Sequence, residues 1–148
     1  MYQHLLVPLD GSSNANEALK EAISLAKGWD AKLLLLHVTD INQFGGYGRG
    51  LAYTEVIASM RENATELMDQ AKKQATAAGV TVTTASLEGA PKQQITDVAN
   101  DDENGIDLIV IGKSGTNAFS RLVVGSTTTY VVQHAQPNVL VVNDIAED

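Results

Sequence analysis

A series of short apolar runs, spaced along the whole chain, constrains the fold more than any other feature. Three of them are nearly continuous, which is typical of strands buried on both faces of a sheet; they are residues 4–9 (HLLVPL), 31–38 (AKLLLLHV) and 107–111 (DLIVI). Residues 138–142 (NVLVV) predict a last strand. A fifth segment, residues 80–88 (VTVTTASLE), alternates apolar and polar side chains and predicts a half-exposed edge strand.

Helical patterns lie between these runs. Apolar stripes run from Ala15 to Ala26 and from Val56 to Ala78, two further helices are expected after Pro91 and over residues 126–135, and Asn104-Gly105 is expected to stop the third. For the first helix, Asn14 with Glu17 predicts the cap and Gly28 the end, and Gly79 ends the second. Strand and helix thus alternate five times, and no repeat or linker interrupts them. We therefore expect one α/β domain, residues 1–148, with a parallel sheet.

The charge and composition of the chain restrict its partners. Eighteen acidic against ten basic residues give a net charge of -8, which argues against nucleic acid or an anionic membrane as partner. The sequence has no cysteine, so disulfides and cysteine–zinc sites are excluded. The first residues have no basic segment before the apolar run, and no run approaches the length of a membrane helix, so we expect a cytoplasmic protein.

Three glycines and a row of hydroxyls follow the fourth strand. Gly112 and Gly115 come directly after it, and Gly125 opens the hydroxyl run Ser126 to Thr129 at the expected start of a helix. The start of a helix offers unpaired N–H groups and the positive end of its dipole, and glycine lets the backbone approach a ligand or take positive φ. Such a site would bind phosphate without a basic surface. The alternative is an ordinary glycine turn with a serine cap.

The spacing G-x2-G-x9-G-[ST] resembles the ATP-binding signature of the universal stress protein family. The opening VPLDGSSNANEAL and the closing HAQPNVLVV are similar to the same family's first and last segments, so the resemblance covers essentially the whole chain. It implies a five-stranded parallel sheet of order 3-2-1-4-5 with helices on both faces, which is a Rossmann-like fold of the adenine-nucleotide α-hydrolase type. It also implies an ATP-binding regulatory module of the stress response.

The resemblance further implies which residues hold the ligand. Pro8, Leu9 and Asp10 would line the adenosine, with Asp10 near the ribose or a phosphate-bound divalent cation such as Mg²⁺. Val38 would offer backbone contacts to adenine. The phosphates would lie among the remaining positions, which are Gly112, Lys113, Ser114, Gly115, Gly125, Ser126, Thr127 and Thr128. Where the family often has a basic residue before the second glycine, this chain has Ser114, so Lys113 or Arg121 would have to supply the charge.

Several readings stay open at the level of sequence. Asp10 suits a helix cap as well as a ligand, and the glycines of residues 40–50 suit a plain connection or a flap over a ligand. Two other functions compete with a regulatory module: an ATPase or adenylyl-transferring ligase, and a flavodoxin-like electron carrier. Against the ligase, the chain has DGSSNAN where such ligases carry SGGxDS after the first strand. Against the flavodoxin-like carrier, the glycines follow strand four, whereas the FMN phosphate loop of flavodoxins follows strand one. No residue in the phosphate region is an evident general base, so we expect little or no turnover.

The expected strand order also predicts how the chain assembles. It places Val139 to Val142 on an edge strand, and an apolar edge is a liability unless another strand covers it. We therefore expect a homodimer joined through the last strand, which the resemblance also implies.

Overall fold

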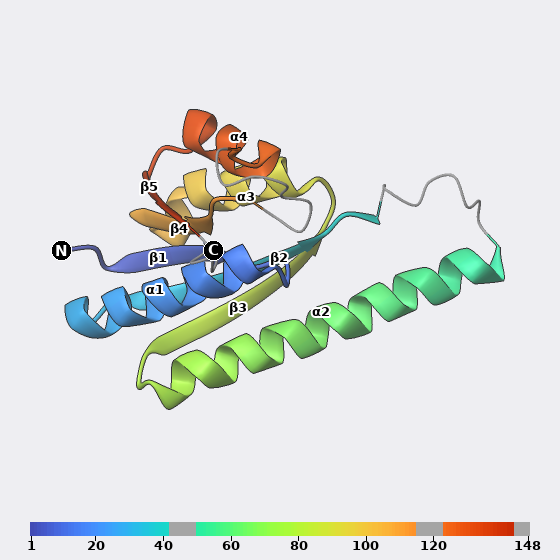
Figure 1. Cartoon of the computed structure of the whole chain (residues 1–148), viewed down its shortest axis with the longest axis horizontal. Helices are drawn as coiled ribbons and strands as arrows, with labels where there is room; N and C mark the ends of the chain where they lie inside the picture. The colour runs from blue at the N-terminus through green and yellow to red at the C-terminus, as the bar shows by residue number, and fades with distance from the viewer. Residues whose placement is uncertain (42–49, 115–122, 144–148) are drawn as a thin grey trace.

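The computed structural model of the chain describes residues 1–41, 50–114 and 123–143. Within these residues, five parallel strands form one sheet in the order β3-β2-β1-β4-β5, with four α-helices in the crossovers (Figure 1). The elements follow one another as β1 (His4–Pro8), α1 (Ser13–Trp29), β2 (Lys32–Thr39), α2 (Leu51–Ala77), β3 (Thr81–Glu88), α3 (Pro91–Asn100), β4 (Leu108–Gly112), α4 (Ser126–His134) and β5 (Asn138–Val142). The fold class and strand order expected from the sequence are confirmed.

Burial in the sheet follows the sequence patterns that predicted the strands. The central strands β1 and β4 are buried along almost their whole length, because helices cover both of their faces. The edge strand β3 alternates exposed and half-buried side chains, as its mixed threonine and apolar sequence predicts. The other edge strand, β5, exposes Asn138 and half-buries the four apolar residues that follow, which confirms its place at the edge but tests no partner.

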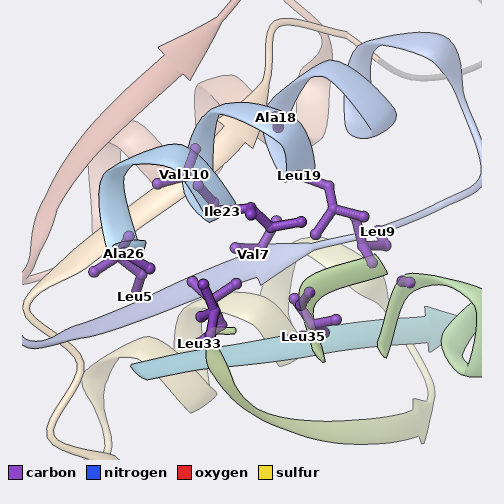
Figure 2. Close-up of a cluster of buried hydrophobic side chains, with 14 of the residues drawn as sticks. Leu5, Val7, Leu9, Ala18, Leu19, Ile23, Ala26, Leu33, Leu35 and Val110 are labelled. Atoms are coloured by element: carbon purple, nitrogen blue, oxygen red, sulfur yellow. The ribbon is translucent and has the colours of Figure 1, made fainter. Parts of the chain in front are cut away.

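The two faces of the sheet carry separate apolar clusters. Helices α1 and α2 cover one face, and Figure 2 shows Leu19 and Ile23 of α1 directed toward Val7 and Leu35 of the sheet. Helices α3 and α4 contribute to the cluster on the other face through Ile95, Ala99 and Val131. Because α1 and α4 lie on opposite faces, their amino-terminal ends lie on either side of the carboxyl end of β4.

The ends of the first helix differ from the sequence-based expectation. Ser12, not Asn14, is the N-cap of α1, and its hydroxyl oxygen accepts a hydrogen bond from Ala15 N–H at 3.1 Å. The helix also runs past Gly28 to Trp29 and ends on Asp30, whose φ of 54° lies in the left-handed region. The pattern of Asn and Glu three apart was ambiguous here because three consecutive residues, Ser12 to Asn14, all suit a cap.

Two other helix boundaries also differ. Helix α2 begins at Leu51, five residues before the apolar stripe at Val56, since Ala52 to Glu55 continue the helix without adding to its apolar face. Helix α3 ends at Asn100, and a short 3-10 helix, Asp102–Asn104, separates it from Gly105. Gly79 and Gly105 do have positive φ, 82° and 61°, as expected of residues that stop a helix.

A carboxylate closes the amino-terminal end of the sheet. The two oxygens of Asp107 accept hydrogen bonds from Gln3 N–H at 2.9 Å and His4 N–H at 3.0 Å, and Asp107 N–H donates to His4 O at 3.0 Å. Backbone donors at the start of β1 are therefore satisfied within the protein. This end of the sheet is a structural closure.

Candidate functional site: a cavity at the carboxyl end of the sheet

A cavity of about 650 Å³ opens at the carboxyl end of the sheet, where the chain leaves β1 and β4 toward opposite faces. Ligands of open parallel sheets bind at this reversal of strand order, and the volume suits a small organic ligand. The described residues that line it are Pro8, Leu9, Asp10, Ser12, Ala15, Leu36, Val38, Pro91, Ile95, Ile111, Gly112, Ser114, Val123, Val124, Gly125, Ser126, Thr127 and Thr128.

One part of the lining is apolar. Leu36 and Val38 come from the end of β2, Pro91 and Ile95 from the first turns of α3, and Ile111 from β4. These side chains come from three different elements of the fold, each held by the packing of the sheet. An apolar surface of this kind can accommodate a flat aromatic ring.

The start of α4 forms the polar part. Gly125 is the N-cap of α4, and because it has no side chain, no side-chain hydrogen bond caps the helix. The backbone N–H groups of the first turn, together with the hydroxyls of Ser126 and Thr127, therefore border the cavity. Gly125 N–H itself donates to Lys113 O at 2.9 Å, which joins the start of α4 to the end of β4.

Thr128 has a structural contact at the same place. It is 3% exposed, and its hydroxyl donates to Gly112 O at 2.7 Å. The hydroxyl hydrogen is thus used to fix the first turn of α4 against β4. We expected Thr128 to face phosphate with its hydroxyl; the hydrogen bond shows that this donor is already engaged within the protein.

Gly112 is required by packing rather than by backbone conformation. A Cβ built on Gly112 would lie 2.7 Å from the backbone carbon of Asn14 and 2.8 Å from its carbonyl oxygen, which is closer than real Cβ atoms approach. Neither Gly112 nor Gly125 has positive φ; Gly125 has φ -62° and ψ 154°. Of the two roles expected of these glycines, close backbone approach and positive φ, positive φ does not apply to either residue. At Gly112 the absent side chain lets α1 lie directly against β4.

The loop between β1 and α1 holds Asp10 at the rim. Its Oδ1 accepts a hydrogen bond from Ser12 N–H at 2.9 Å, so the carboxylate organises the turn that leads to the N-cap without being the cap itself. His37 supports the same loop, because its Nδ1 lies 2.7 Å from Leu9 O. A carbonyl oxygen only accepts, so Nδ1 carries the hydrogen.

Metal binding by side chains alone finds no support in the described ranges. Within residues 1–41, 50–114 and 123–143, no group of three or more His, Cys, Asp or Glu side chains is placed to hold an ion. A cation at Asp10 would therefore need most of its ligands from elsewhere.

Ten of the twelve residues proposed from the sequence lie around this one cavity. Lys113 is not among the described residues that line it, although its backbone joins β4 to α4 and β5 through hydrogen bonds at 2.9 Å. Gly115 and Arg121 lie outside the described residues, as does most of the glycine-rich segment 40–50.

Sequence reasoning named Val38 but missed the rest of the apolar part of the lining. Leu36 and Ile111 lie in the carboxyl-terminal halves of their strands, and Pro91 and Ile95 lie in the first turns of a helix, so strand order and helix starts together could have indicated them. Val123 and Val124 carried no such signal. They lie before the start of α4 and are 57% and 44% exposed.

The sheet order, the helices on both faces and the cavity at the switch point define a Rossmann-like α/β protein of the kind that binds ligands outside its strand ends. A family model confirms this class and makes it more specific, because it matches residues 1–143. The chain belongs to the universal stress protein family.

Individual relatives agree with the family model. A putative universal stress protein SH1215 of Staphylococcus haemolyticus is 38% identical over 99% of this chain and 89% of its own length. Universal stress protein MJ0531 of Methanocaldococcus jannaschii is 33% identical over 96% of this chain and 82% of its own length. Among solved structures, universal stress protein UspA from Lactobacillus plantarum is 34% identical with a TM-score of 0.82, and the match covers 95% of this chain and 97% of UspA.

More distant solved structures share the fold and carry nucleotides. A universal stress protein in complex with cAMP is 24% identical with a TM-score of 0.68, covering 97% of this chain and 98% of its own. The Archaeoglobus fulgidus protein in complex with dAMP is 20% identical with a TM-score of 0.66, covering 95% and 98%. These two likenesses concern the fold.

None of the described helices combines the length and the apolar character that a membrane crossing needs.

Proposed function

We propose that the cavity at the carboxyl end of the sheet binds ATP, and that the chain acts as a single-domain, cytoplasmic regulatory module of the stress response. The observation that carries the proposal is the cavity itself, which combines an apolar wall with the uncapped amino-terminal turn of α4. The glycine and hydroxyl signature of the sequence lies at that turn, and distant proteins of this fold hold cAMP and dAMP.

The two parts of the cavity suit the two parts of the nucleotide. The adenine ring would lie against Leu36, Val38 and Ile111, and the backbone at the end of β2 would contact its edge. The phosphates would lie at Gly125, Ser126 and Thr127, because uncapped N–H groups at a helix start bind anions. This local device explains how a chain of net charge -8 would hold a polyanion.

The remaining residues would complete this arrangement. Pro8, Leu9 and Asp10 would border the ribose, and Gly112 with Ser114 would border the phosphate chain. Lys113 and Gly115 remain proposed phosphate contacts on the strength of the signature alone. A divalent cation such as Mg²⁺ fits Asp10, because this ion typically takes one or two carboxylates, phosphate oxygens and water.

A calorimetric titration of ATP tests the proposal. We expect a dissociation constant in the micromolar range, which corresponds to about -8 kcal/mol or weaker. Gly125→Val should abolish binding, because a branched side chain would fill the space where phosphate meets the helix start. The backbone angles of Gly125, φ -62° and ψ 154°, are open to valine, so the variant should still fold. Unchanged affinity in a folded Gly125→Val protein would refute the assignment.

We propose further that bound ATP is held rather than turned over. The hydroxyls of Ser126 and Thr127 are poor general bases at neutral pH, and Asp10 is the only carboxylate among the described lining residues. Phosphate release above about one per second, the low end of ordinary enzyme rates, and its loss in Asp10→Ala, would instead establish an ATPase.

The apolar edge strand supports a homodimer. Val139 to Val142 are half-buried in a single chain, and Val132 of α4 is 51% exposed. Antiparallel pairing of β5 with its two-fold mate would satisfy the free backbone edge and cover these side chains. Light scattering at micromolar concentration should give about twice the chain mass of 15.7 kDa; the mass of one chain would contradict the dimer.

A further inference from the structure

We infer that Asn14 is a positioning residue whose side-chain amide orients the hydroxyl of Ser114 as a hydrogen-bond donor toward the phosphates. The inference rests on the proposed function, because it concerns the same cavity and the same ligand. It adds a residue that the glycine signature does not contain and that does not itself line the cavity.

The packing of α1 on β4 brings the two residues together. Asn14 is the second residue of α1 and is 8% exposed. Its backbone lies against Gly112, at a distance that leaves no room for a Cβ on that residue. Two positions further along the chain, Ser114 meets the Asn14 side chain, and Asn14 Nδ2 lies 3.2 Å from Ser114 Oγ. The contact joins residues 100 positions apart.

The direction of this hydrogen bond decides what Ser114 can do. An amide nitrogen only donates, so Ser114 Oγ must be the acceptor toward Asn14. A serine hydroxyl has a single hydrogen, and that hydrogen is then directed away from Asn14. Because Ser114 lines the cavity, the hydroxyl can donate to an anionic ligand there. Without Asn14 the hydroxyl would rotate among several partners, including water.

Such an orientation matters because the described lining of the cavity contains no Lys or Arg side chain. Within this described lining only neutral donors are available to the phosphates, and a hydrogen bond to a charged group contributes more than one between neutral groups. The simpler account is that the hydrogen bond from the buried Asn14 amide to Ser114 stabilises the fold and has no role in binding. In that case its loss would alter stability but not the preference for phosphate.

A double-mutant cycle separates these accounts. ATP and adenosine are titrated by calorimetry into the full chain and into Asn14→Ala, Ser114→Ala and the double variant. We expect each single change to weaken ATP on the order of tenfold and to leave adenosine unchanged. The double variant should bind ATP no more weakly than either single variant, because both changes remove one shared donor.

A matched control uses an asparagine at the opposite end of the sheet. Asn104 Nδ2 donates to Val98 O at 2.9 Å, outside the cavity lining, so Asn104→Ala should leave the ratio of ATP to adenosine affinity unchanged. Additive losses in the double variant, or an equal loss for adenosine, would overturn the inference while leaving the proposed function intact. Failure of the unmutated chain to bind ATP would instead overturn both.

Discussion

The two ends of the sheet solve the same problem in different ways. Both ends contain backbone donors that no strand can satisfy. At the amino-terminal end, the Asp107 carboxylate accepts from Gln3 and His4, so these two donors are not available to a ligand. At the carboxyl end, the N-cap of α4 is Gly125, which has no side chain to cap the helix, and a cavity borders this uncapped turn. The difference indicates which polar groups stabilise the fold and which are available for binding.

The two helix starts near the cavity repeat this contrast on a smaller scale. The start of α1 is capped by the Ser12 hydroxyl and supported by Asp10. The start of α4 has no such side chain. An anion would therefore meet open N–H groups at α4 and occupied ones at α1. We therefore expect the phosphates to bind at the start of α4.

The largest effect is expected from a substitution at the carboxyl end of the sheet. Gly112→Ala places a Cβ 2.7 Å from the Asn14 backbone, so α1 and β4 must separate. We expect a loss of stability of about 1–3 kcal/mol and a weakened affinity for ATP. Denaturant unfolding and calorimetric titration measure the two effects.

Gly28→Ala is the matched control, since no atom lies within 4 Å of a Cβ built there. Because Gly28 is inside α1, alanine should raise stability by about 0.5–1 kcal/mol and leave affinity unchanged. Equal stability losses in the two alanine variants would show that close packing at Gly112 is not what the fold requires.

Asp107→Ala should break the amino-terminal end only. It removes the acceptor for two backbone N–H groups and should lower stability by about 1–2 kcal/mol. Affinity for ATP should stay at the unmutated value, because Asp107 does not line the cavity. A large loss of affinity in a folded Asp107→Ala protein would remove the distinction between a structural end and a binding end.

The smallest expected effect concerns Arg61 and Glu88. Arg61 Nε lies 2.6 Å from Glu88 Oε1, and the hydrogen bond from Arg61 lowers the pKa of Glu88, with Coulomb attraction adding to it and desolvation opposing it. Since the folded pKa is lowered, the stabilisation is present above the ordinary value of 4.5 and is lost as pH falls through the lowered pKa.

Both of these side chains are largely exposed to solvent, so the pair should contribute little. Arg61→Ala should lower the melting temperature slightly at neutral pH and low salt. The difference from the unmutated chain should vanish at high salt and at acidic pH. A difference that persisted in 1 M salt, where exposed charges are screened, would contradict this account.

Much of the fold could be predicted from the sequence because burial imposes simple patterns of apolar and polar residues. The strands buried on both faces, such as residues 107–111, had to be continuously apolar, and the half-exposed β3 had to alternate. Helix ends were harder to predict. Ser12, Ser13 and Asn14 all suit a cap, and only the position of Asp10 and the packing of α1 select Ser12.

The candidate site was accessible where it depends on local chemistry. The hydroxyls after Gly125 sit at a helix start, which the sequence pattern indicated. The reason for Gly112 was not accessible, because it depends on the approach of Asn14 from the other half of the chain. Apart from Val38, the apolar wall was missed for the same reason, since Leu36, Pro91 and Ile111 meet only in the folded protein.

The contrast between the two ends can be measured directly by following backbone amide resonances during a titration with ATP. We expect the largest chemical-shift changes at Ser126 and Thr127, with Gly112 also affected, because their N–H groups border or adjoin the cavity. The amides of Gln3 and His4 should not move, because Asp107 holds them at the opposite end of the sheet. If saturating ATP left the amide resonances of Ser126 and Thr127 unchanged, or shifted those of Gln3 and His4 most, the claim that ATP binds at the carboxyl end of the sheet would be contradicted.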